Sequence, residues 1–471
     1  MENVMKEITS MEKDFAKWYT DVVKKAKLMD YSGVRGCMIL EPYGCAIWEN
    51  IQKILDKKFK DLNHENVLMP LLISESLLQQ EKDHIEGFAP EVAWVTHGGN
   101  EKLEERLCIR PTSEVLFCDY FSKKIKSWRD LPKLYNQWCN VVRWEKTTRP
   151  FLRTVEFYWQ EGHTIHETEK EAREETEKML NLYFDFLEKD LCIFTIKGQK
   201  TEKEKFAGAE TTYTIEAMMH DGKILQSATS HYFGNSFAKA FGIKYRNKFN
   251  QESFPYQTSW GLTTRVIGGI IMTHGDNKGL VLPPSVAPIQ IIIIPINLKN
   301  KEIIEKSLKI YDILNKNFRV KLDLTDQTPG WKFSEYEMKG VPLRLEFGPK
   351  DLKNNQCVLV KRNTSEKKIC NLENLEENIC LSLDELKFEL YEESLKRTND
   401  LTYLIEDNFE EILDKKYGFI KSSWCGNSKC EDLVKEKYGV TSRCIIKKNN
   451  ANKCPLCGEN SSYNIYWGKS Y

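Results

Sequence analysis

The 471-residue sequence has no net charge, no long hydrophobic run and no internal repeat. Lysine plus arginine and aspartate plus glutamate both total 69, so a nucleic-acid partner would need local basic patches instead of a global field. The most apolar stretch, residues 289–296, is far too short to span a membrane and predicts a buried strand. Length and composition therefore predict a globular, non-membrane protein of roughly three domains.

Export signals are missing as well. The first thirty residues are charged throughout and contain acidic side chains that transit peptides avoid. Nine of the fourteen cysteines are scattered over the first 380 residues without the spacing of a disulfide framework. We expect a cytoplasmic protein in which these thiols are reduced.

One segment takes the place of the glycine-rich loop that many nucleotide sites use. Residues 141–163 predict two strands joined by a basic loop, with Arg143 and Glu145 on the first strand and Arg153 on the second. Strand alternation places three side chains on one face of the second strand: Phe157, Trp159 and Glu161. Guanidinium groups bind phosphate, carboxylates accept amines and aromatic rings stack on purines, so the hairpin indicates a nucleotide pocket. A polar hairpin with ordinary cross-strand ion pairs is the alternative.

Two further segments accompany this hairpin. Residues 36–44 (GCMILEPYG) lead into an expected helix, and the segment ends at residues 67–70 (VLMP). Residues 259–265 (SWGLTTR) place another arginine after a glycine, at the start of an expected helix. In this order the three segments resemble motifs 1, 2 and 3 of the class II aminoacyl-tRNA synthetases.

The sequence between and around these motifs resembles the prolyl-tRNA synthetase family, and the resemblance extends from about residue 10 to Tyr471. The similar phrases are FAPEVAWV (88–95), IRPTSE (109–114), KEKFAG (203–208), TSH (229–231), HGDNKGLVLP (274–283) and GWKF (330–333). The stretch between His163 and Trp260 is too short for the editing domain that bacterial-type members insert there. The sequence therefore resembles the archaeal and eukaryotic type of this family.

The resemblance implies an α+β protein that activates L-proline with ATP and transfers the prolyl group to tRNA(Pro). The proline-rich break at residues 283–288 and the β-α pattern after it divide the chain. We expect a class II antiparallel-sheet catalytic domain at residues 1–285. An α/β anticodon-binding domain with mostly parallel strands should follow at 286–398, and a small α+β tail at 399–471. Motif 1 in this class implies a homodimer.

The resemblance also assigns roles to individual residues. Arg143 and Arg265 are the expected catalytic residues. The ATP-binding set comprises Arg143, Glu145, Arg153, Thr154, Phe157, Gln226, Thr229, Thr263 and Arg265, with Gln226 a candidate ligand for Mg²⁺. The proline-binding set comprises Thr112, Glu114, Arg143, Trp159, Glu161, His231 and Gly261. Ordinary core positions are the alternatives for Trp159 and His231. We interpret His163, His166 and Glu167 as polar residues at a helix start.

The tail contains a second chemical signal. Cys425 and Cys430 form one pair and Cys454 and Cys457 another, with Gly426, Pro455 and Gly458 supplying tight turns. Four thiolates are the ligands of a closed structural Zn²⁺ site, whereas Cys444 stands alone among β-forming residues and suits the core. The family's archaeal and eukaryotic type carries a zinc-binding tail. Unrelated surface cysteines are the alternative.

For the anticodon, we expect polar side chains near strand ends to read guanine edges. These residues are Arg344, Glu346, Lys350 and Lys361. Two other functions stay open on sequence alone. One is another class II synthetase, such as the threonyl type, although no metal ligand set lies near motif 2. The other is a non-catalytic synthetase-like protein that binds tRNA or ATP.

Overall fold

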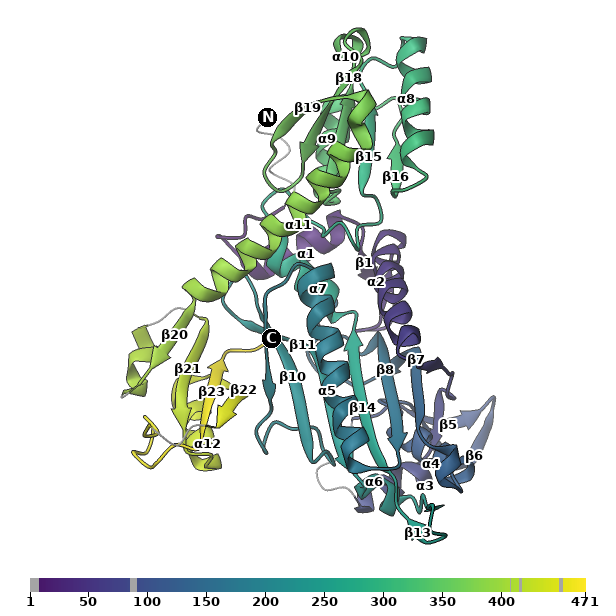
Figure 1. The fold of residues 1–471 in the computed structure, drawn as a ribbon, viewed down its shortest axis with the longest axis vertical. Coiled ribbons are helices and arrows are strands. Elements are labelled where there is room, and N and C mark those ends of the chain that lie inside the picture. Colours follow the sequence, from purple (N-terminus) through teal and green to yellow (C-terminus); the bar gives the residue numbers. More distant parts are fainter. Residues whose placement is uncertain (1–7, 85–90, 407, 415–416, 449–451) are drawn as a thin grey trace.

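The computed structural model describes residues 8–84, 91–406, 408–414, 417–448 and 452–471. Residues 1–7 of the expected first domain and residues 88–90 of the FAPEVAWV phrase lie outside this part of the chain. Three bodies meet along one long helix, with the catalytic sheet below, the β-α module above and the tail at the side (Figure 1). No helix in the described ranges is both long and apolar enough to cross a membrane.

The largest element is a sheet of eleven strands that is antiparallel except at its two edge pairs, β20–β21 and β3–β7. Its order is β20-β21-β23-β22-β9-β10-β11-β14-β8-β7-β3. The antiparallel catalytic sheet that the resemblance implied is therefore confirmed. In that order, the strand bounds are Thr402–Ile405, Phe419–Trp424, Tyr463–Gly468, Thr441–Lys448, Thr195–Gln199, Thr211–Met218, Ile224–Gly234, Tyr256–Thr263, Glu156–His166, Lys133–Val142 and Glu65–Asn66.

Helices cover one face of this sheet. One of them, α5, begins with a capping box in which Thr168 and Glu171 each bind the other's backbone N–H. Trp18 and Val22 of α1, and Ala26 just beyond its end, are buried in the core. The four helices of this core are α1 (Phe15–Lys25), α2 (Pro42–Asp61), α5 (Glu169–Asp185) and α7 (Arg265–His274). A π-helical turn at Phe186–Asp190 extends α5.

Smaller elements close the lower end of the catalytic body. A three-stranded antiparallel sheet in the order β4-β6-β5 packs with short helices around a second apolar cluster. The β12–β13 hairpin lies at this end, whereas the β1–β2 hairpin lies at the upper end, near α1 and α2 (Figure 1). The bounds are β1 Met29–Tyr31, β2 Met38–Leu40, β4 Leu72–Ser74, α3 Glu75–His84, β5 Trp94–Gly98, β6 Glu101–Ile109, α4 Glu114–Lys124, α6 Ser236–Ala240, β12 Tyr245–Arg246 and β13 Glu252–Ser253.

The β-α module after the proline-rich break has a five-stranded mixed sheet in the order β16-β15-β17-β18-β19. The expectation of mostly parallel pairing is wrong. Strand β15 is parallel to β16 and β17, but β17, β18 and β19 form an antiparallel meander, because the connections at residues 348–355, which contain α10, and 362–366 are too short for a parallel crossover. The bounds are β15 Ile291–Pro295, α8 Lys301–Leu314, β16 Val320–Leu322, α9 Pro329–Met338, β17 Leu343–Phe347, α10 Pro349–Lys353, β18 Gln356–Lys361 and β19 Lys367–Asn371.

The helix α11 (Leu375–Asp400) runs from this module to the tail (Figure 1). The tail contributes α12 (Ser428–Tyr438) and four strands of the central sheet. Its strand β22 joins the catalytic strand β9 through the pair Ile445 and Gln199. The tail and the catalytic body therefore share one sheet, and the proposed division at residue 399 cuts through it.

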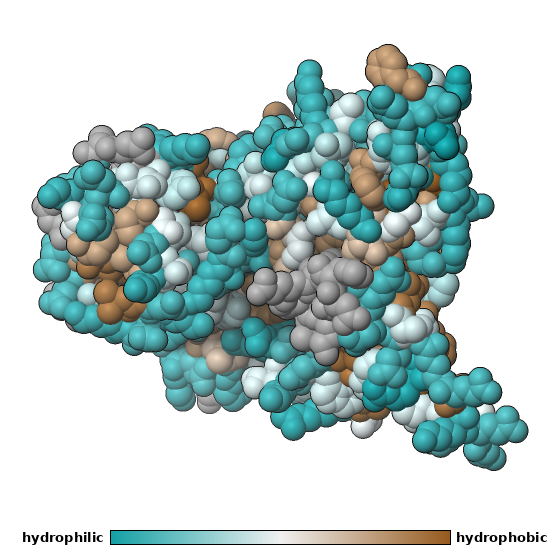
Figure 2. Space-filling view, turned by 90° about the horizontal axis from the view of Figure 1, so that it is seen from below, coloured by the Kyte–Doolittle hydropathy of each residue, from teal (hydrophilic) through white to brown (hydrophobic). Residues whose placement is uncertain are grey.

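Seen from below, the surface of the molecule is mainly hydrophilic, and its hydrophobic residues form small scattered groups (Figure 2).

Two local expectations are corrected here. Arg143, Glu145 and Arg153 lie in the connection between β7 and β8, because a tight turn at Arg149 and Arg153 replaces the strand ladder. His163 and His166 are not at a helix start, since β8 continues to His166 and buries both rings.

Candidate active site

A cavity of about 230 Å³ opens on the sheet face opposite α5, where β8, β11 and β14 lie side by side. The structure places every expected catalytic, nucleotide and proline residue on its lining. These residues are Thr112, Glu114, Arg143, Glu145, Arg153, Thr154, Phe157, Trp159, Glu161, Gln226, Thr229, His231, Gly261, Thr263 and Arg265. Their individual roles stay predictions at this point.

Strand register brings these residues together from distant parts of the sequence. On β8, Phe157, Trp159 and Glu161 all line the cavity, so the period-2 interpretation is confirmed. Across the ladder, Glu161 pairs with Gly261 of β14, which in turn pairs with Thr229 of β11. Because Gly261 has no side chain, the floor between Glu161 and Thr229 stays open.

One end of the cavity is cationic. Arg143 is fixed by a hydrogen bond from its Nε to the carbonyl oxygen of Pro111 at 3.0 Å, and Arg265 donates to Leu152 at 3.1 Å. Neither guanidinium forms an ion pair among the described residues, whereas Arg153 lies 3.8 Å from Glu145. Burial, together with repulsion from Arg143 and Arg153, lowers the pKa of Arg265 to about 10. Such uncompensated cations are suited to a polyanionic ligand.

An aromatic wall stands beside Arg143. Phe157 and Trp159 meet edge to face, with ring centres 5.9 Å apart. The guanidinium carbon of Arg143 lies 5.6 Å from the first ring centre and 5.4 Å from the second. Both rings are therefore within the range of a cation–π contact, which restricts where Arg143 can point.

The other end is acidic and tightly bonded. Glu161 accepts hydrogen bonds from Ser113 and from Gln137 Nε2 at 2.7 Å, and lies 2.9 Å from His163 Nε2. Burial raises the pKa of Glu161, but these partners bring that pKa below its ordinary value. The carboxylate is thus held ionised and oriented, as a ligand ammonium group requires. Thr112 similarly donates its hydroxyl proton to Glu114.

His231 closes this end as a neutral ring. Burial lowers its pKa to about 3, and its Nδ1 lies 3.0 Å from Thr212 Oγ1. The ring of Phe206 packs against it with centres 4.8 Å apart. At neutral pH the imidazole therefore adds polarity without adding charge.

Several lining residues were missed by the sequence interpretation. His163 stacks on Phe117 at 4.1 Å and holds Glu161, and its place within the alternating pattern of β8 was the available signal. Trp260 packs over Gly162, where an added Cβ would lie only 2.1 Å from the indole. Lys200, Glu204 and Phe206 come from the segment after β9, and no local pattern indicated that they face the cavity.

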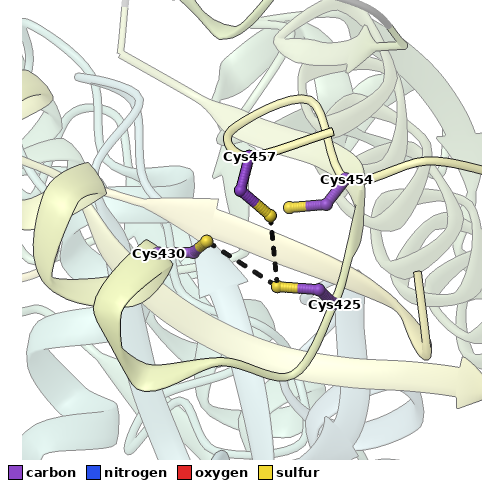
Figure 3. Close-up of side chains that lie close together, drawn as sticks. All are labelled: Cys425, Cys430, Cys454 and Cys457. Atoms are coloured by element: carbon purple, nitrogen blue, oxygen red, sulfur yellow. Dashed lines mark hydrogen bonds between the residues drawn. The ribbon is translucent and has the colours of Figure 1, made fainter. Parts of the chain in front are cut away.

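A second cluster lies in the tail. The Sγ atoms of Cys425, Cys430, Cys454 and Cys457 are all within 4.8 Å of one another (Figure 3). Cys425 Sγ is 3.7 Å from Cys430 Sγ and 3.7 Å from Cys457 Sγ. Left-handed backbone at Gly426 and Gly458 forms the turns that direct the sulfurs inward. Cys444 lies buried on β22, apart from this group.

The candidate anticodon residues are already engaged in ion pairs. Arg344 on β17 donates to Glu346 at 3.0 Å and to Glu337 at 3.1 Å. Lys361, the last residue of β18, lies 2.7 Å from Glu389 and 2.9 Å from Glu366. Lys350 lies on the short helix α10.

Comparison with known proteins gives three family matches along the chain. Residues 94–274 match the tRNA synthetase class II core domain (G, H, P, S and T). Residues 290–380 match an anticodon binding domain, and residues 406–471 match the C-terminal domain of prolyl-tRNA synthetases.

Whole-chain similarity is high. A proline–tRNA ligase of Ruminiclostridium cellulolyticum is 59% identical over 99% of both chains. A proline–tRNA ligase 2 of Bacillus cereus is 58% identical over 98% of both. Prolyl-tRNA synthetase from Cryptosporidium parvum, solved with halofuginone and AMPPNP, superposes with a TM-score of 0.94 at 40% identity over 100% of both chains.

Proposed function

Since the chain belongs to the prolyl-tRNA synthetase family and acts as an ATP-dependent proline–tRNA ligase, we propose that the cavity on the central sheet is where both steps occur. In the first step, a carboxylate oxygen of proline bonds to the α-phosphorus of ATP, and pyrophosphate leaves. In the second, the terminal ribose hydroxyl of tRNA(Pro) attacks the prolyl carbonyl carbon, and AMP leaves. The convergence of uncompensated arginines, an aromatic wall and an ionised carboxylate in one cavity carries this proposal.

The cationic end takes ATP. Arg143 holds the α-phosphate and the proline carboxylate, because it interacts electrostatically with Arg265 of the cationic end and with Glu114 and Glu161 of the acidic end. Arg153 and Arg265 hold the outer phosphates, supported by Thr154 and Thr263, and Phe157 stacks on adenine while Glu145 accepts its amine. Gln226 and Thr229 face the ribose and phosphates. The incoming carboxylate is already ionised, so catalysis is positioning and electrostatic stabilisation without a general base.

Mg²⁺ is expected with the triphosphate, where it neutralises phosphate charge. The amide oxygen of Gln226, on the cavity lining, is a hard oxygen ligand of the kind Mg²⁺ accepts. One protein oxygen suffices, because this ion takes most of its ligands from phosphate and water.

The acidic end takes L-proline. Its secondary ammonium group is attracted by Glu161 and Glu114, the latter oriented by Thr112. Trp159 forms the wall against the pyrrolidine ring, neutral His231 limits the depth, and Gly261 leaves room for the ring. A small pocket separates proline poorly from alanine. Residues 164–259, all described, form strands and helices of the catalytic body and contain no separate editing domain.

The four tail cysteines fit a structural Zn²⁺ ion. Zinc–sulfur bonds of about 2.3 Å in a tetrahedron place neighbouring sulfurs about 3.8 Å apart, close to the two distances of 3.7 Å. Four protein ligands leave no open position, so bound zinc would stabilise the tail and supply no chemistry.

The β-α module is the proposed binding site for the tRNA(Pro) anticodon. Arg344 and Glu346 lie next to each other on one strand face, so donors and an acceptor are presented together, as the edge of a guanine requires. Lys361 adds positive charge for the tRNA backbone.

We place the aminoacylation of tRNA(Pro) in the cytoplasm, where charged tRNA is used.

A homodimer is the proposed assembly. Exposed apolar side chains lie on and just before the motif 1 segment: Tyr31, Val34 and Ile39 belong to the β1–β2 hairpin, and Leu68 follows β3. Leu68 is 84% exposed in the single chain. An isologous interface over this segment would bury these side chains.

Arg143→Ala should reduce proline-dependent ATP–pyrophosphate exchange about 10²-fold or more, because it removes the donor shared by both substrates. The matched control is Lys146→Ala, an exposed cation in the same connection, which should leave exchange unchanged. A folded Arg143→Ala protein with near-normal pyrophosphate exchange would contradict the assignment of the cavity as the active site.

Elemental analysis should find about one zinc per chain, as a four-thiolate site requires. Cys457→Ser should lose that zinc and lower the melting temperature while ATP still binds. Cys380→Ser, which changes an exposed cysteine of α11, should retain the metal. Metal-free protein with unchanged melting would contradict a structural site.

Glu346→Ala should weaken aminoacylation of tRNA(Pro) and leave pyrophosphate exchange unchanged, because it lies outside the cavity. Glu305→Ala, at an exposed position on α8 of the same module, should change neither rate. An equal fall in both rates for Glu346→Ala would remove the anticodon assignment.

Sedimentation at micromolar concentration should show a dimer, and Leu68→Glu should shift it towards monomer by burying a charge in the interface. Phe388→Glu, on exposed α11, is the control and should remain dimeric. An active native monomer at this concentration would contradict the proposed assembly.

A further inference from the structure

The segment from Lys200 to Phe206 forms a wall of the cavity. Lys200, Glu204 and Phe206 line it. Between them the chain makes a turn in which the N–H groups of Glu204 and Lys205 donate to the carbonyl oxygen of Thr201, at 3.1 and 2.9 Å. Because Phe206 packs against His231, the position of this turn sets the shape of the acidic end.

A tail residue, Glu431, holds this turn from behind. It lies buried on α12 and accepts hydrogen bonds from Thr201 Oγ1 at 2.8 Å and from the Ser442 hydroxyl. The Thr201 hydroxyl also accepts the N–H of Glu204 at 3.3 Å. Glu431 therefore fixes the direction of a hydroxyl that caps the turn. The neighbouring Asp432 pairs with Lys203 of the same turn.

A second tail residue, Arg443, reaches the same segment through Glu216. Glu216 of β10 is fully buried, with one carboxylate oxygen 2.8 Å from Lys200 Nζ and the other 2.8 Å from an Arg443 guanidinium nitrogen. Burial raises the pKa of Glu216, but the positive charges of Arg443 and Lys200 lower that pKa to about 2. Glu216 is also opposite Gln226 in the β10–β11 ladder, so this triad supports the nucleotide end.

We propose that Glu431 and Arg443, both from the tail, are positioning residues for the cavity: they hold the segment 200–206 in the shape that binds proline and ATP, without touching either substrate. The two contacts are independent, yet they converge on adjacent residues, Thr201 and Lys200. Both contacts cross between the tail and the catalytic body, although every residue that lines the cavity belongs to the catalytic body. This inference rests on the proposed function of the cavity.

The first test is the Michaelis constant for proline in pyrophosphate exchange, measured well below the melting temperature of each variant. Glu431→Ala should raise this constant about tenfold, with kcat largely unchanged, because a buried hydroxyl loses its acceptor. Glu431→Gln should restore it, because the amide oxygen can accept the same two hydroxyl protons. Lys437→Ala, on the exposed face of α12, is the matched control and should behave as the native chain.

Thr201, the partner of Glu431 in the segment 200–206, gives a second variant that does not depend on how well Glu431→Ala folds. Thr201→Val removes the hydroxyl at nearly equal volume and should raise the Michaelis constant for proline by a similar factor. Combined with Glu431→Ala it should add little, because both changes remove one interaction. Arg443→Met should instead raise the Michaelis constant for ATP more than that for proline.

An unchanged Michaelis constant for proline in folded Thr201→Val protein would overturn the proposal. So would a Glu431→Gln variant whose Michaelis constant for proline is raised as much as that of Glu431→Ala. Failure of the proposed function has a different signature, since it would leave exchange intact in Arg143→Ala.

Discussion

The antiparallel pairing of β8 with β14 is the constraint on which the cavity depends. It sets Glu161 opposite Gly261 and Trp159 opposite Thr263. On the other face of β8, Gln160 meets Tyr183 of α5. A slip of one residue would turn the cavity residues into that core, because strand side chains alternate. Trp260 fixes the register by packing on Gly162, where any larger residue would collide with the indole.

On this frame, the cavity keeps opposite charges apart before any substrate arrives. Arg143, Arg153 and Arg265 repel one another at one end, while hydrogen bonds at the other end hold Glu161 ionised. Groups fixed in this way need little reorganisation when charge moves during the reaction. Under the proposed function, proline and ATP would each relieve one half of this imbalance. Arg143 would then lie where the reacting carboxylate and the α-phosphate meet.

The sequence predicted the face of β8 and the fifteen cavity positions because those residues lie within recognisable motifs. Strand alternation sufficed for Phe157, Trp159 and Glu161. It failed for Arg143 and Arg153, since a tight turn interrupts the ladder. It also failed for Lys200 and Glu216. Their roles depend on Arg443, which is 227 residues from Glu216 in sequence, and a buried ion pair of that separation leaves no local pattern. The antiparallel meander of the β-α module was missed for a related reason: β-α alternation at its start does not fix the pairing of later strands.

The same long-range contacts change how the tail should be understood. A domain appended by a linker could move freely, but β22 continues the catalytic sheet through Ile445 and Gln199. Next to this pair, a Cβ on Gly198 would meet the Ile445 carbonyl oxygen at 2.4 Å, so the close approach requires glycine. Separating the two bodies would expose Glu216 and Lys200, which stay paired with each other, and would leave Arg443 without its carboxylate partner, which is unfavourable for groups that folded together. The tail is therefore held to the catalytic body by the electrostatics of a buried triad as well as by the backbone. Its four-cysteine cluster lies beside β21, in the same sheet as the strands that line the cavity.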